Sequence, residues 1–242
     1  MKKTGIMIIM MMLSTVILFS ETQKIDKFKD KMLSIEREKV ETLECVFEIS
    51  INDGISGTSK MYMSGNKLRI DIEGQNTERG MNDMIIVQDS AGSYTKMNNK
   101  WIKGKADGGN SIVNQMKIVN QEESLKGIMN KNDFTVESIK GNQAVVSFKE
   151  AVGLIGPAKT KMGIDLNTGN IMFQEQNFNE GRVIIDFKYD NKSGIIPSEV
   201  NIRNIENKVG EPLHVKIRIS DVKVNHKLDE AVFLTDEIQN TK

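Results

Sequence analysis

The sequence predicts a mainly β protein with one large antiparallel sheet of about eleven strands. Apolar and polar residues alternate almost without pause from 160 to 220, where Met162 and Ile164 flank Lys161, for example. Such a period of two is typical of a sheet with one apolar and one polar face. Short turn sequences such as Asn167-Thr168-Gly169 separate the alternating runs. Because many strands joined by short turns must curl, we expect the sheet to enclose an apolar space.

The first twenty residues have the pattern of a secretory signal peptide. Lys2 and Lys3 precede an apolar run over residues 5–19, and the small residue Ser20 follows it. The run is shorter than the roughly 20 residues of most membrane-spanning helices, so an uncleaved anchor is the secondary reading. The single cysteine, Cys45, lies too far along the chain to accept a lipid at a mature N-terminus. We therefore expect a periplasmic protein that is not itself lipidated.

Charge and cysteine content exclude several classes of partner. Removal of Lys2 and Lys3 lowers the 33 basic residues to 31 against 33 acidic ones, a net charge of about −2. This balance gives no electrostatic basis for binding nucleic acid. One cysteine cannot form an internal disulfide, and Cys45 shares its alternation phase with Leu43 and Phe47. We expect Cys45 to be a small buried side chain, and residues 21–242 to form one β domain.

The mature chain begins with a predicted helix over residues 24–40. Apolar residues at helical spacing predict one buried side for it: Ile25, Phe28, Met32, Leu33 and Ile35. Three strands joined by tight turns follow, at about 41–51, 61–63 and 68–72. After a polar loop come strands at 84–88 and 93–97 and a short piece around Trp101.

A helical insert then interrupts the strands at about residues 109–131. Glycines precede it, and its apolar stripe suits a lid over the mouth of the sheet, formed by Ile112, Met116, Val119, Leu125, Ile128 and Met129. Strands resume at 134–139 and 144–148. Residues 151–157 read as an apolar loop with two glycines. Hairpins then continue to a last strand that passes through Val224 toward Phe233.

Catalytic and metal-binding patterns are weak, so we predict no enzyme activity, no metal and no cofactor. The two histidines, His214 and His226, have no partner at metal-ligand spacing, and His214 falls on the polar face of its strand. Asp165, Glu175 and Asp186 lie on neighbouring predicted strands, where solvent exposure explains them better than a catalytic pair. A secreted hydrolase is the remaining enzymatic alternative.

The predicted apolar face is the candidate site. Its side chains form either an ordinary core or the wall of a ligand cavity, and alternation alone does not decide between them. Ten of the 15 methionines lie after residue 20, beside one Trp and three Tyr, and flexible thioethers suit a wall that adapts to its ligand. The candidate cavity residues are Phe47, Ile49, Met61, Met63, Leu68, Ile70, Ile86, Phe148, Met162, Ile164, Phe173, Ile185, Phe187, Val215 and Ile217.

The order of these features resembles a known family. A signal peptide, one helix, three strands with the turn sequence from Ser64 to Ile70, a helical insert, the hairpin of residues 163–170 and the closing segment from Ile219 to Phe233 resemble the LolA-like outer-membrane lipoprotein carriers and sorting proteins. The resemblance covers nearly the whole mature chain. In carriers of this family an arginine near the turn between the second and third strands holds the lid; here Gly65 occupies that place, and Arg69 is expected on the polar face.

The resemblance implies an unclosed antiparallel β-barrel with a helical lid. It also implies a non-enzymatic, monomeric chaperone that carries lipoprotein acyl chains, or lipid, through the periplasm. The partners that it implies are an inner-membrane release complex and an outer-membrane acceptor. A domain of the same fold that mediates envelope interactions or senses envelope stress is the alternative function.

Overall fold

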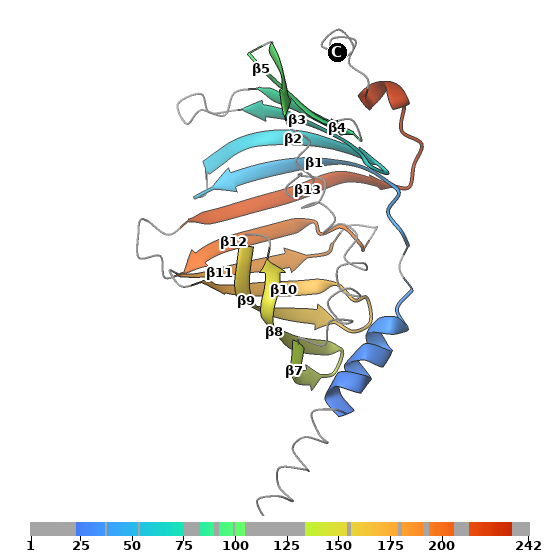
Figure 1. Cartoon of the computed structure of the whole chain (residues 1–242), viewed down its shortest axis with the longest axis vertical. Helices are drawn as coiled ribbons and strands as arrows, with labels where there is room; N and C mark the ends of the chain where they lie inside the picture. Colours follow the sequence, from blue (N-terminus) through green and yellow to red (C-terminus); the bar gives the residue numbers. More distant parts are fainter. Residues whose placement is uncertain are drawn as a thin grey trace, which may run out of the picture. The chain divides into compact units, whose positions relative to one another are not determined.

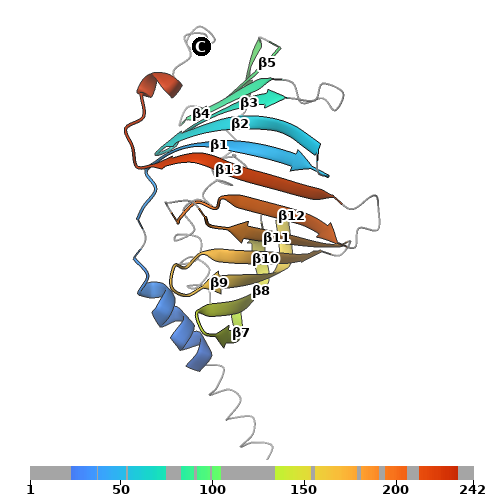
Figure 2. The same cartoon turned by 180° about the vertical axis from the view of Figure 1, so that it is seen from behind.

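The computed structural model describes residues 23–36, 38–52, 54–74, 83–89, 92–98, 100–104, 134–153, 156–178, 181–190, 194–205 and 213–233 of the chain. Within them, 13 strands form one antiparallel sheet (Figures 1 and 2) in the order β6-β5-β4-β3-β2-β1-β13-β12-β11-β10-β9-β8-β7. Strands β6 and β7 end this order, so the sheet is not closed. The predicted fold class, mainly β and antiparallel without closure, is confirmed. The strand number exceeds the predicted eleven, and the short piece around Trp101 is the full strand β6.

The chain divides into two compact units, which we call unit 1 and unit 2. Unit 1 comprises residues 1–37 and 125–177, and unit 2 comprises residues 38–124 and 178–242. The single domain over residues 21–242 stays a prediction. The predicted signal peptide and helical insert lie outside the described residues.

Unit 2 is built around a three-strand meander that pairs with the last strand of the chain. Strand β1 lies between β2 and β13 (Figure 1), so segments from the two ends of the sequence are hydrogen-bonded neighbours. A glycine at Gly65, with φ of 57°, makes the tight turn between β2 and β3. The elements are β1 (Thr42–Ile51), β2 (Gly54–Ser64), β3 (Lys67–Gly74), β4 (Met84–Asp89), β5 (Gly92–Met97), β6 (Lys100–Gly104), β11 (Gly181–Lys188), β12 (Glu199–Ile205), β13 (His214–Val224) and the 3₁₀ helix η3 (Glu230–Phe233).

Unit 1 contains the N-terminal helix and four strands. The helix covers residues 23–33, and the strands are β7 (Phe134–Lys140), β8 (Gln143–Gly153), β9 (Gly156–Asp165) and β10 (Ile171–Phe178). Phe28, 2% exposed, packs edge-to-face on Phe134 of β7, with ring centroids 5.8 Å apart. The helix buries this side because an aromatic pair of that geometry stabilises the contact beyond its buried area.

Two predictions of local structure were wrong. The helix ends at residue 33 instead of 40, where the Ser34 hydroxyl donates a hydrogen bond to the Lys31 carbonyl. Val40 is 3% exposed and packs in the core of unit 2 instead. The predicted loop over residues 151–157 is the end of the β8–β9 hairpin, where Val152 pairs with Pro157 and Gly153 with Gly156.

Candidate functional site

The strands of unit 2 bring the predicted apolar residues onto one face. Register places Cys45, Met61 and Ile70 in one row across β1, β2 and β3, and Ile86 of β4 continues that row. On the other side of β1, Ile49 pairs with Ile217 of β13. The predicted residues that share this face, which we call the apolar face of unit 2, are Phe47, Ile49, Met61, Met63, Leu68, Ile70, Ile86, Ile185, Phe187, Val215 and Ile217.

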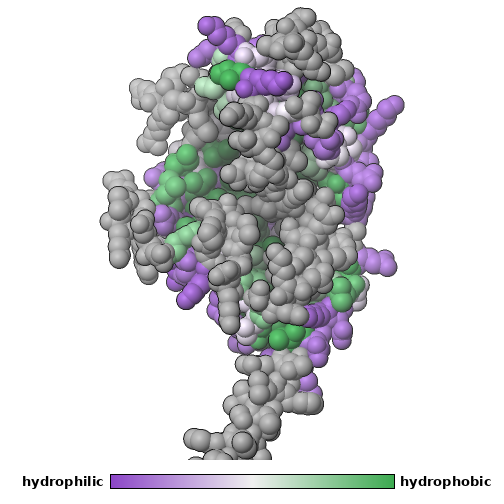
Figure 3. All heavy atoms as spheres, in the orientation of Figure 1, coloured by the Kyte–Doolittle hydropathy of each residue, from purple (hydrophilic) through white to green (hydrophobic). Residues whose placement is uncertain are grey.

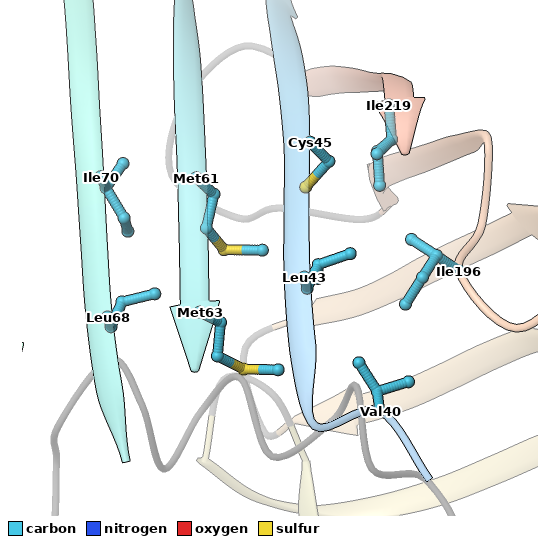
Figure 4. Close-up of a cluster of buried hydrophobic side chains, with 9 residues drawn as sticks. All are labelled: Val40, Leu43, Cys45, Met61, Met63, Leu68, Ile70, Ile196 and Ile219. Carbon is cyan, nitrogen blue, oxygen red and sulfur yellow. The ribbon is translucent and has the colours of Figure 1, made fainter. Parts of the chain in front are cut away.

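One end of this face is a closed core. Leu43, Cys45 and Leu68 have no exposed surface, and Met61 is 1% exposed. These side chains belong to one buried cluster, and Figure 4 shows them on the neighbouring strands β1, β2 and β3, with Val40 and Ile196 of the same cluster beside them. Burial raises the pKa of the Cys45 thiol to about 12, because the thiolate loses its hydration, and the nearby Glu44 carboxylate adds to the rise. The prediction that Cys45 is a buried hydrophobe is confirmed.

The other end of this face is half-buried. Large apolar side chains there keep part of their surface exposed, and all of them except Ile49 and Val215 pack against the core. We call this set the half-buried patch: Phe47, Ile49, Ile72, Ile86, Val200, Val215 and Ile217. Figure 3 shows hydrophobic surface of this kind on one face of the molecule, with hydrophilic side chains around it. Apolar area left in reach of solvent beside a filled core is typical of a binding surface.

Small residues lie in the middle of the half-buried patch. Ser59 of β2 lies between Phe47 and Ile72, and Gly57 lies opposite Ile49. The face therefore carries its smallest side chains between large ones. Both small residues are buried, Ser59 with 7% exposure, so this part of the face is already covered.

Unit 1 has an apolar face of its own. Phe148 of β8 pairs with Thr160 of β9, and the predicted residues Met162 and Ile164 follow Thr160 on the same face. All three predicted side chains are buried, with exposures of 7%, 5% and 0%. The sequence missed the polar side chains among them, because Gln174 and Gln176 of β10 share this face and are buried too.

Phe173 lies on the opposite face, contrary to the prediction. A β-bulge between Ile171 and Phe173 shifts the alternation by one residue, so Phe173 pairs with Gly163 instead of a neighbour of Ile164. Its ring occupies the space in which a side chain at Gly163 would lie. Phe173 therefore leaves the set of candidate cavity residues on structural grounds.

A polar groove of about 610 Å³ lies on unit 2 at strands β3 to β5. It is lined mainly from the face opposite the half-buried patch, by Arg69, Asp71, Ile72, Glu73, Asp83, Met84, Ile85, Lys96 and Asn98. Arg69 donates through Nε to Asp71 at 2.7 Å and through Nη1 to the Val232 carbonyl at 2.8 Å. Arg69 thus lies on the polar face, as predicted, and holds the C-terminal segment there.

The same polar face carries further contacts of the C-terminal segment. His226 Nε2 lies 3.0 Å from Glu44 Oε2, and Lys67 contacts both Glu230 and the Phe233 ring. The hydrogen bond from Lys223, with a further one from His226, lowers the pKa of Glu44 below its usual value. These contacts hold residues 225–233 against strands β1 and β3, so we interpret them as structural contacts and not as a ligand site.

The residues considered for catalysis have local structural partners. Asp165 accepts hydrogen bonds from the backbone of Asn167 and Thr168 in a turn, and Asp186 pairs with Arg203 at 2.5 Å. In the described part of the chain, no cluster of three or more His, Cys, Asp or Glu side chains has the arrangement of a metal site. No helix among the described residues is long and apolar enough to cross a bilayer.

Comparison with known proteins identifies the fold. No family model matches the chain, and no curated protein sequence matches it. A LolA superfamily protein of Nitrosomonas europaea has a similar structure, with a TM-score of 0.51 and 13% identity over 88% of this chain and 98% of its own. A Vibrio parahaemolyticus domain provisionally named an outer membrane lipoprotein-sorting protein gives a TM-score of 0.51 and 10% identity over 93% and 99%. The chain has a LolA-like fold, as the sequence resemblance predicted.

Proposed function

We propose that this protein is a non-enzymatic periplasmic carrier that binds the acyl chains of lipoproteins, or of other lipids, and moves them toward the outer membrane. The half-buried patch carries the proposal, because it leaves large apolar side chains partly uncovered beside a filled core. The names of the two structural neighbours, a LolA superfamily protein and a lipoprotein-sorting domain, support it. By the family resemblance, its partners are an inner-membrane release complex and an outer-membrane acceptor, and it acts as a monomer.

Acyl-chain binding needs only apolar contact of the kind that this face provides. Each buried methylene contributes about 0.8 kcal/mol, so a few contacts along a chain hold it without a charged or catalytic group. Ser59 lies between Phe47 and Ile72, and Gly57 lies opposite Ile49, so an acyl chain that reached this part of the face would meet small residues there. The predicted cavity residues on the apolar face of unit 2, Phe47 and Ile217 among them, would form the wall of the acyl-chain site.

A matched pair of substitutions tests the proposed site. Ile217→Asp places a charge in the half-buried patch, whereas Ile184→Asp places it at a half-buried position on the opposite face of β11. We expect Ile217→Asp to weaken uptake of a fluorescent acyl probe by about tenfold or more, because a carboxylate on the apolar wall is costly to desolvate. Ile184→Asp should bind as the wild type does.

Native mass spectrometry of protein purified from a bacterial periplasm is the independent measurement. The proposal expects co-purified lipid or lipoprotein. Ligand-free protein that also takes up no acyl probe contradicts the carrier function and favours the envelope interaction or stress-sensor domain. Equal loss of binding in Ile217→Asp and Ile184→Asp contradicts the placement of the site.

The lid is a separate part of the proposal and rests on the sequence. Met116→Asp and Met129→Asp interrupt the apolar stripe of residues 109–131, so we expect weaker probe capture with an unchanged β-sheet circular dichroism spectrum. If both substitutions unfold the protein, the segment belongs to the core and is no lid.

A further inference from the structure

The half-buried patch continues along one row of side chains to an edge of the sheet in unit 2. Register places Ile72 of β3, Met84 of β4, Met97 of β5 and Lys100 of β6 opposite one another in turn. Side chains at such positions are neighbours on one face. Because adjacent strands lie about 4.8 Å apart, the row extends over about 14 Å from β3 to β6. We call these four residues the edge row.

The apolar members of the edge row are accessible in the folded protein. Ile72 and Met84 are half-buried, and Met97 is 38% exposed. Ile102 of β6, which lies in the next row on the same face, is 58% exposed. A ligand can therefore contact these apolar side chains without any movement of the strands.

One positive charge ends the edge row. Lys100 is exposed, and among the paired positions of β1 to β6 it is the only charged residue on this face. The other two lysines of β5 and β6 lie on the opposite face, where Lys96 lies over the Trp101 ring and Lys103 over the Tyr94 ring. In the described part of the chain, the Lys100 ammonium has no hydrogen-bond or ion-pair partner. Its charge is thus available to a ligand.

The composition of the edge row defines what it can bind. An acyl chain that lies along Ile72, Met84 and Met97 brings its head group to Lys100, and two flexible thioethers suit a chain of variable conformation. A carboxylate matches the single ammonium charge. A phosphate monoester carries up to two negative charges, and a cationic head group is repelled.

We infer that the edge row binds a fatty acid, with the acyl chain on Ile72, Met84 and Met97 and the carboxylate paired with the Lys100 ammonium. This inference rests on the proposed carrier function and names the head group that this end of the apolar face selects. Lys100 Nζ donates to a carboxylate oxygen at the edge of the sheet. Because Lys100 is exposed, neither charge has to be buried, and the attraction is modest and sensitive to salt.

Charge reversal at Lys100 tests the inference in the full mature chain. Palmitate, methyl palmitate and hexadecyltrimethylammonium each displace a fluorescent acyl probe from the wild type, Lys100→Gln and Lys100→Glu. Loss of one exposed ion pair should weaken palmitate binding about three- to fivefold in Lys100→Gln, and the repulsion in Lys100→Glu should weaken it about tenfold or more. Methyl palmitate should bind all three proteins within about twofold. The cationic probe should bind Lys100→Glu more tightly than the wild type.

Lys103→Glu is the matched control, because it makes the same change of charge on the same strand but on the opposite face. It should leave the affinity for palmitate within about twofold of the wild type. A lysine on an edge strand also opposes pairing with another sheet edge, but that role predicts no dependence on the charge of the ligand. Raising the salt concentration to about 1 M should reduce the palmitate difference between wild type and Lys100→Glu.

The outcomes separate this inference from the carrier function. Both lysines are exposed, so all variants should keep the β-sheet circular dichroism spectrum of the wild type. Palmitate affinity that is unchanged in Lys100→Glu, or equally reduced in Lys103→Glu, overturns the inference alone. Tighter binding of hexadecyl phosphate than of palmitate to the wild type overturns the choice of a carboxylate. Failure of the wild type to bind any of these probes overturns the carrier function, and this inference with it.

Discussion

At the scale of single residues, Glu199 of β12 shows how the polar face is stabilised. Its carboxylate accepts hydrogen bonds from Lys216 at 2.8 Å, Asn201 at 2.9 Å and Lys188 at 3.0 Å. These bonds, that from Lys216 foremost, lower the pKa of Glu199 to about 2. The side chain is 15% exposed, so solvent screens the cluster only in part. Because three donors share one carboxylate, we expect this cluster to stabilise the fold more than an ordinary surface ion pair does.

We predict that Glu199→Gln lowers the free energy of unfolding by about 1 kcal/mol at pH 7, after allowance for solvent screening. The folded-state pKa lies below the ordinary value of 4.5, so the stabilisation is present above pH 4.5 and is lost as the pH falls toward 2. Urea unfolding across this range should show a steeper loss in the wild type than in the variant. Glu48→Gln, which removes a single partner of Arg218, is the control and should have a smaller effect. Parallel curves for wild type and Glu199→Gln would contradict the cluster's role.

The residue scale also shows where a single sequence stops being informative. Alternation placed most candidate residues on the correct faces, because side chains two apart in a strand share a face. Phe173 was assigned to the wrong face because a β-bulge shifts the alternation by one residue. Neither Phe173 nor its cross-strand partner Gly163 has a sequence pattern that predicts the bulge. Gln174 and Gln176 flank Glu175 in a polar run, so their burial has no signal in the sequence.

At the scale of elements, strands were predicted better than the helix. Strand positions follow from alternation and turn residues, both of which are local. The helix was predicted to extend to residue 40, although its last apolar position at helical spacing is Ile35, and Val40 packs in the unit 2 core instead. Leu33 was expected on the buried side and is 63% exposed. Tertiary packing thus decided the end of the helix and the side it buries.

Two alanine substitutions in this helix test which side it buries. Phe28→Ala removes a ring that is 2% exposed and packs on Phe134, so we expect a loss of about 3 kcal/mol in unfolding free energy. Leu33→Ala, at 63% exposure, should change it by less than about 0.5 kcal/mol. Urea denaturation followed by circular dichroism measures both. Similar losses for the two variants would contradict the orientation of the helix.

At the scale of the whole molecule, the protein combines a filled core with a partly uncovered apolar face. Folding requires the first, because the chain has no disulfide to stabilise it. The proposed carrier function requires the second. Cys45 lies in the core of this face, and Ile217 lies in the half-buried patch. Thiol labelling at Cys45 can therefore report on the core, and substitution of Ile217 on the patch.

Thiol labelling of Cys45 reports when unit 2 opens. The thiol has no exposed surface, and its raised pKa of about 12 keeps it protonated, so a thiol reagent should react only after the core opens. A ligand that binds the native face and not the opened chain slows labelling by a factor of about 1 + [L]/Kd. A hundredfold excess over Kd should therefore slow it by about 100-fold.

The wild type should show this protection with an acyl ligand and none with glycerol. Ile217→Asp should label at a rate that the acyl ligand no longer changes, whereas Ile184→Asp should keep the protection. Rapid labelling of the native wild type would contradict the closed core. If the ligand binds but leaves the labelling rate unchanged, the occupied site survives the opening of unit 2, and the half-buried patch is not where the acyl chain lies.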